Sequence, residues 1–469
     1  MRTEKGQEKG SQVPLLLPAV CLIAGIVAAP LSPGWGLVLA ALCVGTVLAW
    51  ALKHWPALQS LVVYLCCFFL GMLVAEPADG PLLAEHQPVA GVVFSEPAEK
   101  PKTIAVDVCL PDAGTMVRCY LWKDAQSRRV VLGSRLMLAN GKGGFVGSDD
   151  WHFGGDGYDR LSAFDGLRLW FLQVRHRLLD NYRRQQTEDE AYAVLAAMTL
   201  GDKSALTSEL RDAYSVTGAS HVLALSGLHL GIIWLLLFRL TLGRRRWWLS
   251  QVLIILGIWA FAFLTGLSTS VLRSATMLST YALFSAGGRR RSPVNLLCFT
   301  AIVMLLFSPT AIYDVGFQLS FCSVLSILLL LPLFEACFPE GYFLRHRFQK
   351  WLFGMVGISL AAQVGVAPLI AYHFGRFSTY FLLTNFIVVP AATLILYGAL
   401  LMVVMPGVVG PVLLWLVEML NKALGWMSQL PCSSIDGLRP SMFQVCLTYL
   451  IFLCLYLAVR RVVRVEPVT

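Results

Sequence analysis

Three polar side chains capable of chemistry lie inside a long apolar segment near the middle of the chain. His221, Ser226 and His229 belong to a hydrophobic run that continues to Leu242, and their spacing puts them roughly on one helical face. A serine beside a histidine base is the core of a nucleophilic hydrolase. However, a spacing of three along one helix places the side chains of Ser226 and His229 poorly for direct contact. The alternatives are a polar lining for a hydrated route, or hydrogen bonds that only hold neighbouring helices together.

Further polar side chains stand in, or at the ends of, later apolar segments. An unpaired arginine in hydrocarbon is costly, so we expect Arg273 to pair with Asp314, either as part of a pore or only to tie two helices. A polyanion needs a route with amide, hydroxyl and imidazole groups and few fixed negative charges. The residues that meet this description, and that we expect to line such a route, are His221, Ser226, His229, Arg273, Asp314, Gln318, Gln363, His373 and Asn385.

The composition places most of the chain in lipid. Of its 469 residues, 57% are hydrophobic and 14% are charged, whereas soluble proteins carry about 25% charged residues. The formal net charge of +9 comes largely from short basic clusters beside apolar segments, such as Arg244–Arg246 and Arg289–Arg291. Short cytoplasmic loops carry such clusters, so the charge indicates topology more than DNA binding.

The apolar segments predict a polytopic α-helical membrane protein with about twelve spans. Threading them places both termini in the cytoplasm and the long polar interval after the third span outside. Short joints, together with Pro368 and Pro390 inside spans, predict that some spans are discontinuous. The expected spans are approximately 14–29, 35–50, 58–75, 221–242, 249–266, 270–286, 294–307, 317–334, 351–371, 380–404, 411–427 and 441–459.

The external interval begins with a β-type pattern. Between about Val89 and Phe145, short runs of β-formers alternate with Pro, Gly and Asp, which predicts a small barrel. The glycine-rich stretch from Gly143 to Gly157 leaves little room for later strands, so we expect an abridged domain. Some of its side chains could contact DNA, with aromatic residues stacking on bases and basic residues meeting phosphates. The alternative is that they only pack the barrel, which the near-neutral charge of the interval favours. The candidates are Phe94, Arg118, Tyr120, Trp122, Lys123, Arg128 and Arg129.

Two cysteines in this interval could be bonded. Cys109 and Cys119 flank the turn sequence Pro111–Gly114, so they could face each other across a hairpin. We predict a disulfide, because the interval is expected on the oxidising side. No CxxC pair, zinc-type His/Cys spacing or nucleotide-binding motif occurs in the sequence, so we expect no metal and no cofactor.

A basic amphipathic helix follows the β region. Tyr158 to Gln185 carries apolar residues on one side and five arginines on the rest. Such a helix beside a membrane domain lies in the interface plane, or it forms a lid or funnel wall for a DNA strand.

Several separate motifs resemble, in order, the ComEC family of competence proteins. They are Gly201–Tyr214, Thr217–His221, Leu225–His229, Ser270–Arg273, Tyr313–Phe321 and the stretch from Gln363 to Asn385 around Tyr372–Arg376. The resemblance covers about residues 190 to 400. It implies an inner-membrane channel that admits single-stranded DNA into the cytoplasm during natural transformation.

The resemblance also implies a domain organisation. We expect an N-terminal membrane segment of three spans (1–76), an OB-like external domain (77–150), an amphipathic helical linker at the outer face (151–217) and a transmembrane channel domain (218–469). Many family members carry a metallo-β-lactamase-like nuclease domain after the channel. This chain ends at Thr469 and has no His-x-His pair, so we expect the form without that domain and without catalytic activity.

The implied partners are single-stranded DNA, the lipid bilayer, and a separate DNA receptor, cytosolic translocation ATPase and nuclease. Whether the pore lies within one protomer or in a homo-oligomer stays open. The rival hypotheses are a small-molecule or lipid transporter that uses the same polar cavity, and the Ser/His hydrolase.

Overall fold

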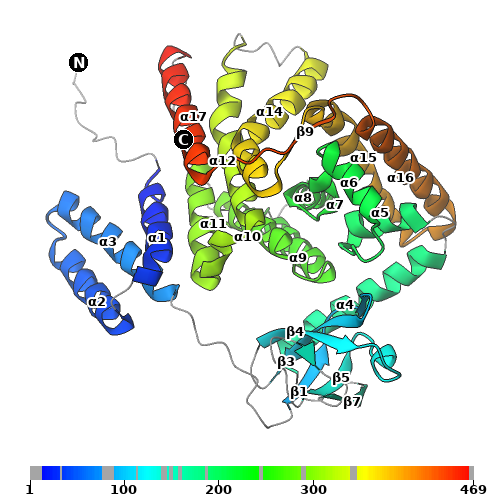
Figure 1. Ribbon diagram of the computed structural model, residues 1–469. Helices are drawn as coiled ribbons and strands as arrows, with labels where there is room; N and C mark the ends of the chain where they lie inside the picture. Colours follow the sequence, from blue (N-terminus) through cyan, green and yellow to red (C-terminus); the bar gives the residue numbers. More distant parts are fainter. Residues whose placement is uncertain are drawn as a thin grey trace.

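The fold is mostly helical, with one small β domain below the helices in Figure 1. The computed structural model describes residues 13–31, 34–75, 89–111, 115–138, 145–146, 151–156, 161–184, 189–241, 247–286, 292–338 and 346–463.

The N-terminal segment is a three-helix unit held together by close backbone contact. Its helices are α1 (Leu16–Ala28), α2 (Trp35–Ala51) and α3 (Pro56–Val74), with the short η1 (Ala29–Leu31) after α1. A Cβ atom at Gly71 would lie 2.3 Å from the carbonyl oxygen of Leu22, and one at Gly25 would lie 2.0 Å from that of Phe68. Only glycine permits such an approach, which is how helices pack tightly in lipid.

The β domain is a single sheet with the strand order β6-β4-β3-β1-β5-β7, and β2 pairs with β3 outside this path. Its buried core includes Val93, Val106, Leu121 and Trp151. Its strands are β1 (Val89–Val93), β2 (Ala98–Glu99), β3 (Thr103–Leu110), β4 (Thr115–Trp122), β5 (Ser134–Leu138), β6 (Phe145–Val146) and β7 (Trp151–Asp156), with a 3-10 turn η2 (Ser127–Arg129) after β4.

One chain segment supplies both ends of this sheet. β6 pairs in parallel with β4 at one end, whereas β7 pairs antiparallel with β5 at the other. Only residues 147–150 separate the two strands, so residues 145–156 contact both edges. The glycine-rich stretch therefore leaves room for two late strands, although β6 has only two residues, and an abridged OB-like domain stays a prediction. The strands also continue to Asp156, beyond the expected boundary at 150.

The predicted disulfide is also wrong. The β3–β4 register pairs Cys109 with Met116 and Cys119 with Val106, so the two cysteines are three positions out of register. Alternate residues of a strand face opposite sides of its sheet. Cys119 therefore lies in the interior core, whereas Cys109 packs under Leu172 on the outer side, and both are free thiols.

Helix α4 (Ala163–Arg184) connects the β domain to the helical domain. Leu172 packs against Phe94 of the β domain, whereas Leu179 lies in the core of the helical domain. The ring of Phe171 also stacks on that of Phe263, 5.5 Å between centroids. Part of the apolar side of the predicted amphipathic helix thus packs against protein, whereas Leu167 and Trp170 are exposed. The place of the helix relative to a bilayer stays a prediction.

The helical domain has two groups of long helices joined by shorter ones. Figure 1 shows α11, α12, α14 and α17 side by side, and α15 and α16 beside α5 and α6, with α8 to α10 between the groups. The elements are α5 (Asp189–Leu200), α6 (Ser208–Val216), α7 (Ser220–Leu223), α8 (Gly227–Thr241), α9 (Trp247–Leu264), α10 (Thr269–Ala286), α11 (Pro293–Phe307), η3 (Pro309–Tyr313), α12 (Val315–Glu335), α14 (Arg347–Phe374), β8 (Arg376–Ser378), α15 (Phe381–Met402), α16 (Pro406–Ser428), β9 (Ser434–Asp436) and α17 (Met442–Val463).

Six helices in the described ranges are long and apolar enough to cross a membrane: α3, α12, α14, α15, α16 and α17. Shorter apolar helices include α1, α2, α8, α9 and α11. Every predicted span except 221–242 overlaps one helix, but the total of about twelve spans stays a prediction.

The predicted discontinuity occurs in one span and not in two others. The expected span 221–242 is interrupted, because α7 ends at Leu223 and α8 begins at Gly227. By contrast, Pro368 and Pro390 lie inside the uninterrupted helices α14 and α15.

Candidate functional site

The break between α7 and α8 changes the relation of Ser226 to His229. The imidazole Nδ1 of His229 accepts a hydrogen bond from the backbone N–H of Ser226 at 3.3 Å and lies 3.2 Å from its Oγ. Direct contact was not expected for two residues on one helix. It arises because Ser226 precedes the first turn, as in a capping box, where the third helical residue reaches back to the cap.

This arrangement is a helix cap. Because Nδ1 of His229 accepts the amide hydrogen of Ser226, the imidazole proton is on Nε2. That Nε2 is buried, and it has no hydrogen-bond partner among the residues that the structure describes. In a Ser/His/Asp triad, a third group orients the imidazole through the nitrogen that faces away from the serine.

His221 lies apart from this cap. It is an exposed residue of α7, and its Nδ1 lies 3.0 Å from the carbonyl oxygen of Gly218. The interruption at residues 224–226 separates it from α8, so the expected shared helical face with His229 does not form.

The expected pair of Arg273 and Asp314 is present. Nη1 of Arg273 lies 3.6 Å from Oδ1 of Asp314, and the arginine is only 3% exposed. The same carboxylate oxygen accepts the backbone N–H of Phe317 at 2.7 Å and so caps α12. A Cβ atom at Gly316 would lie 3.1 Å from Nη2 of Arg273, so this glycine lets the guanidinium approach the start of α12.

Gln318 and His373 extend this polar cluster to α14. Nε2 of His373 lies 3.1 Å from Oε1 of Gln318, whose Nε2 donates to the carbonyl oxygen of Ile312 at 3.0 Å. Gln318 is one helical turn from Asp314. α10, α12 and α14 therefore meet through consecutive polar contacts.

Asn385 and Gln363 lie at a second place, between α14 and α15. Nδ2 of Asn385 donates to Oγ of Ser359 at 3.1 Å. Gln363 is half-buried one turn beyond Ser359 on the same face of α14. Eight of the nine predicted residues thus form three local groups, with His221 outside them, and no hydrogen bond among the described residues joins one group to another.

An ion-pair junction of Arg376, Asp212 and Asp436 lies near the C-terminal end of α14. The guanidinium of Arg376 contacts Oδ1 of Asp212 at 2.6 Å and Oδ1 of Asp436 at 2.5 Å. The sequence marked Arg376 within a motif, but it offered no signal for partners 164 and 60 positions away.

The external candidates divide into buried, paired and exposed residues. Phe94 is 3% exposed and packs under α4, with Arg168 over its ring, so the prediction that it stacks bases is wrong. Arg118 makes two hydrogen bonds to Asp107, at 2.7 and 3.0 Å. Exposed residues are Trp122, Lys123, Arg128 and Arg129, while Tyr120 is half-buried with Lys100 over its ring.

Three of these residues share one face of an accessible strand. Arg118, Tyr120 and Trp122 occupy every second position of β4, so their side chains lie on one side of the sheet, opposite the interior core. Trp122 is 47% exposed. We call these three residues the β4 stripe.

The helical domain agrees with a family model described as Competence protein over residues 198–462, more than half of the chain. The chain belongs to the competence protein family. The matched region of this competence protein contains all three polar groups and the Arg376 junction.

Three relatives illustrate the range of similarity. ComE operon protein 3 of Bacillus subtilis is 28% identical over 56% of this chain and 32% of its own length. An uncharacterized protein of Aquifex aeolicus is 32% identical over 47% of this chain and 51% of its own. Competence protein ComA of Neisseria gonorrhoeae is 29% identical over 41% of this chain and 28% of its own. The matches thus span about half of these relatives or less, and no solved structure matches this competence protein.

Proposed function

We propose that this protein is an inner-membrane channel that passes single-stranded DNA into the cytoplasm during natural transformation. The observation that carries the proposal is the competence family match across the helical domain, which contains five of the six helices long enough to span a membrane. Relatives named for competence support the same process. A separate receptor, motor ATPase and nuclease would complete it.

The polar groups of the helical domain suit a polyanion. Arg273 neutralises Asp314, the one carboxylate among the proposed path residues. The remaining members offer amide, hydroxyl and imidazole groups on α8, α12, α14 and α15. Apolar side chains exposed along α17 and α2 would contact the bilayer, which covers such surfaces in a multi-pass protein.

We also propose that the β domain is an OB-like barrel that receives the strand before the channel. The support is its connectivity: β1 pairs with both β3 and β5, and residues 145–156 contact β4 and β5. An OB barrel binds oligonucleotides on its second and third strands. These correspond to β3 and β4, so the β4 stripe is the proposed DNA face.

Deletion of the gene tests the channel. We expect cytosolic DNA entry to be lost while DNA uptake into the periplasm stays normal, and a plasmid copy of the gene should restore entry. An unchanged transformation frequency in the deletion strain would contradict the proposal. A loss of small-molecule or lipid transport with normal DNA entry would support the transporter instead.

A further inference from the structure

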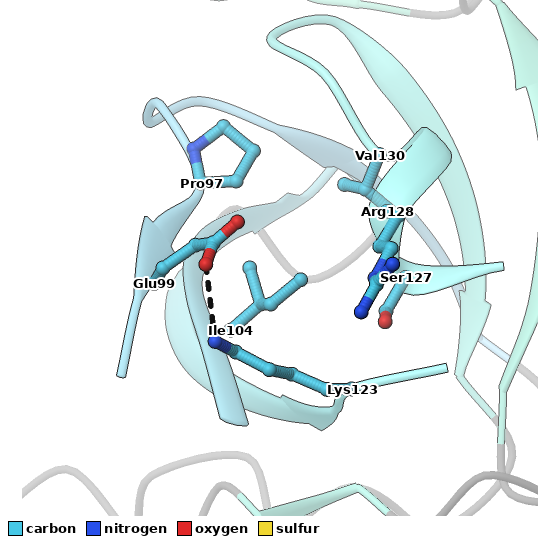
Figure 2. Close-up of a pocket in the computed structure, with 7 residues that line it drawn as sticks. All are labelled: Pro97, Glu99, Ile104, Lys123, Ser127, Arg128 and Val130. Atoms are coloured by element: carbon cyan, nitrogen blue, oxygen red, sulfur yellow. Dashed lines mark hydrogen bonds and ion pairs between the residues drawn. The ribbon is translucent and has the colours of Figure 1, made fainter. Parts of the chain in front are cut away.

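A cavity opens at the edge of the β domain core, beside the end of β4 (Figure 2). Its volume is about 280 Å³, and Ile104 and Val130, each 3% exposed, form its apolar floor. Pro97 forms one wall. Glu99, Lys123 and Arg128 stand around it, from β2, the end of β4 and η2. We call this cavity the β2–η2 pocket.

The charges around the pocket leave one cation available. Nζ of Lys123 lies 3.0 Å from Oε2 of Glu99, so these two charges offset each other. No salt bridge recorded in the described part of the chain uses Arg128, and its guanidinium is exposed. The pocket therefore combines a free guanidinium, an apolar floor, and a donor and an acceptor side by side.

The loop that carries the basic residues is held in place before any ligand arrives. The backbone N–H of Ser127 donates to Oδ1 of Asp124 at 2.6 Å, and the N–H of Asp124 donates to Oγ of Ser127 at 2.8 Å. Ser127 is fully buried. Such preorganisation lowers the entropy cost of binding.

The position of the pocket relates it to the β4 stripe. Lys123 directly follows Trp122, the last residue of the stripe. Ile104 and Val130 belong to the interior core, so the pocket opens at the end of β4, and a strand that lies along the stripe must turn round this end to reach it. Bases stack on exposed aromatic rings, and cationic grooves follow the phosphates.

We propose that the β2–η2 pocket binds one nucleotide of the single-stranded DNA, with its phosphate against Arg128 and its base over Ile104 and Val130. This inference rests on the proposed function, because it needs a strand on the β4 stripe. The Glu99–Lys123 pair presents both an acceptor and a donor to the base edge. Contact with the apolar floor is available to the face of any base, so recognition depends little on sequence, as transport of arbitrary DNA requires.

The test measures binding of the full-length protein in lipid nanodiscs to a fluorescent oligonucleotide of about 12 nucleotides, near the upper range for one OB fold. Arg128→Gln should weaken binding about tenfold, the effect of one charged hydrogen bond. It should also reduce the slope of log K against log salt by about 0.7, the value for one phosphate of a single strand. Arg461→Gln removes an equal charge from an exposed position near the end of α17, far along the chain from the β domain, and should change neither quantity.

A second variant probes the base. Val130→Phe fills the floor without changing charge, and it should weaken binding of the normal oligonucleotide while hardly affecting an abasic one of equal length. Thermal unfolding of each variant confirms that the domain is folded. Wild-type affinity and salt slope in Arg128→Gln would overturn the pocket.

The outcomes also separate the pocket from the channel. Loss of binding in Trp122→Ala but not in Arg128→Gln overturns the pocket and leaves the β4 stripe standing. If the wild-type protein binds no oligonucleotide, the pocket proposal fails, whereas the channel is decided by cytosolic DNA entry in the deletion strain.

Discussion

At the scale of single residues, the polar side chains of the helical domain each have a local structural task. His229 caps α8 through Ser226, Asp314 caps α12 and faces Arg273, and Gln318 ties the start of α12 to His373. The pore lining that we propose from these groups would be rigid, because a partner holds each residue named here. The same contacts mean that many substitutions here will alter stability as well as transport.

Replacement of His229 by Leu should lower the amount of folded protein in the membrane. The change removes the acceptor of the Ser226 amide, and loss of such a cap costs about 0.5–2 kcal/mol. His229→Gln is the matched control, since glutamine serves at this position of a capping box. Membrane abundance and DNA entry per molecule are the measurements. Normal abundance of His229→Leu with reduced entry per molecule would assign His229 to the path and not to the cap.

The Arg273–Asp314 pair should show a measurable coupling energy. Asp314→Asn keeps an oxygen that can cap α12 but removes the charge, so its effect isolates the ion pair. Because Asp314 is partly exposed, we expect a coupling of about 1 kcal/mol rather than that of a fully buried pair. A double-mutant cycle with Arg273→Met, followed by thermal unfolding in detergent, measures it. Additive effects would show that the pair contributes nothing.

At the scale of elements, packing distances decide which substitutions each helix or strand tolerates. α1 and α3 approach each other closely at Gly25 and Gly71. By contrast, a Cβ atom added at Gly36 on α2 would have no heavy atom of the described residues within 4 Å beyond its own chain neighbours. In the β domain, the β3–β4 register decides which side of the sheet each cysteine faces.

Gly71→Ala should therefore destabilise the N-terminal unit, whereas Gly36→Ala should not. The new methyl group at Gly71 would lie 2.3 Å from a backbone oxygen, so the two helices must separate. At Gly36 the methyl group has space, and replacing a helical glycine by alanine stabilises a helix by up to about 1 kcal/mol. Thermal unfolding of both variants gives the comparison. An equal change in both would contradict the close approach of α1 and α3.

The free thiols of the β domain should resist reagents. Burial raises the pKa of Cys119 to about 11, so this thiol is protonated and unreactive near neutral pH. Thiol labelling of the folded protein should be the same before and after reduction. Since the ordinary thiol pKa is 9.0, the folded state holds its proton more tightly, and stability should fall as pH rises from about 9 to about 11. Increased labelling of Cys109 and Cys119 after reduction would restore the disulfide.

At the scale of the whole molecule, two features connect regions that are distant in sequence. α4 packs against the β domain through Leu172 and against the helical domain through Leu179. The Arg376 junction joins α6, β8 and β9. We therefore expect the β domain to hold a set position relative to the helical domain, because α4 packs against both.

The membrane topology of the whole chain can be tested by reporter fusions. Fusions after Leu242, Ser285 and Arg464 should report the cytoplasm, because basic clusters lie beside each position. A fusion near Gly143 should report the outer side. A cytoplasmic signal from the Gly143 fusion would contradict both the topology and an external DNA-binding domain.

The sequence by itself determined the helical elements and the chemistry of their polar residues. Apolar runs predicted the helices because length and hydropathy are local properties, and the cost of a buried charge was enough to pair Arg273 with Asp314. Tertiary structure alone decided the start of α8 at Gly227, which turned Ser226 and His229 into a cap. It also decided that Phe94 lies under α4 and that Cys109 and Cys119 face opposite sides of the sheet. These outcomes depend on strand register and on contacts between distant segments, and the free energy of such packing does not show in any local pattern of residues.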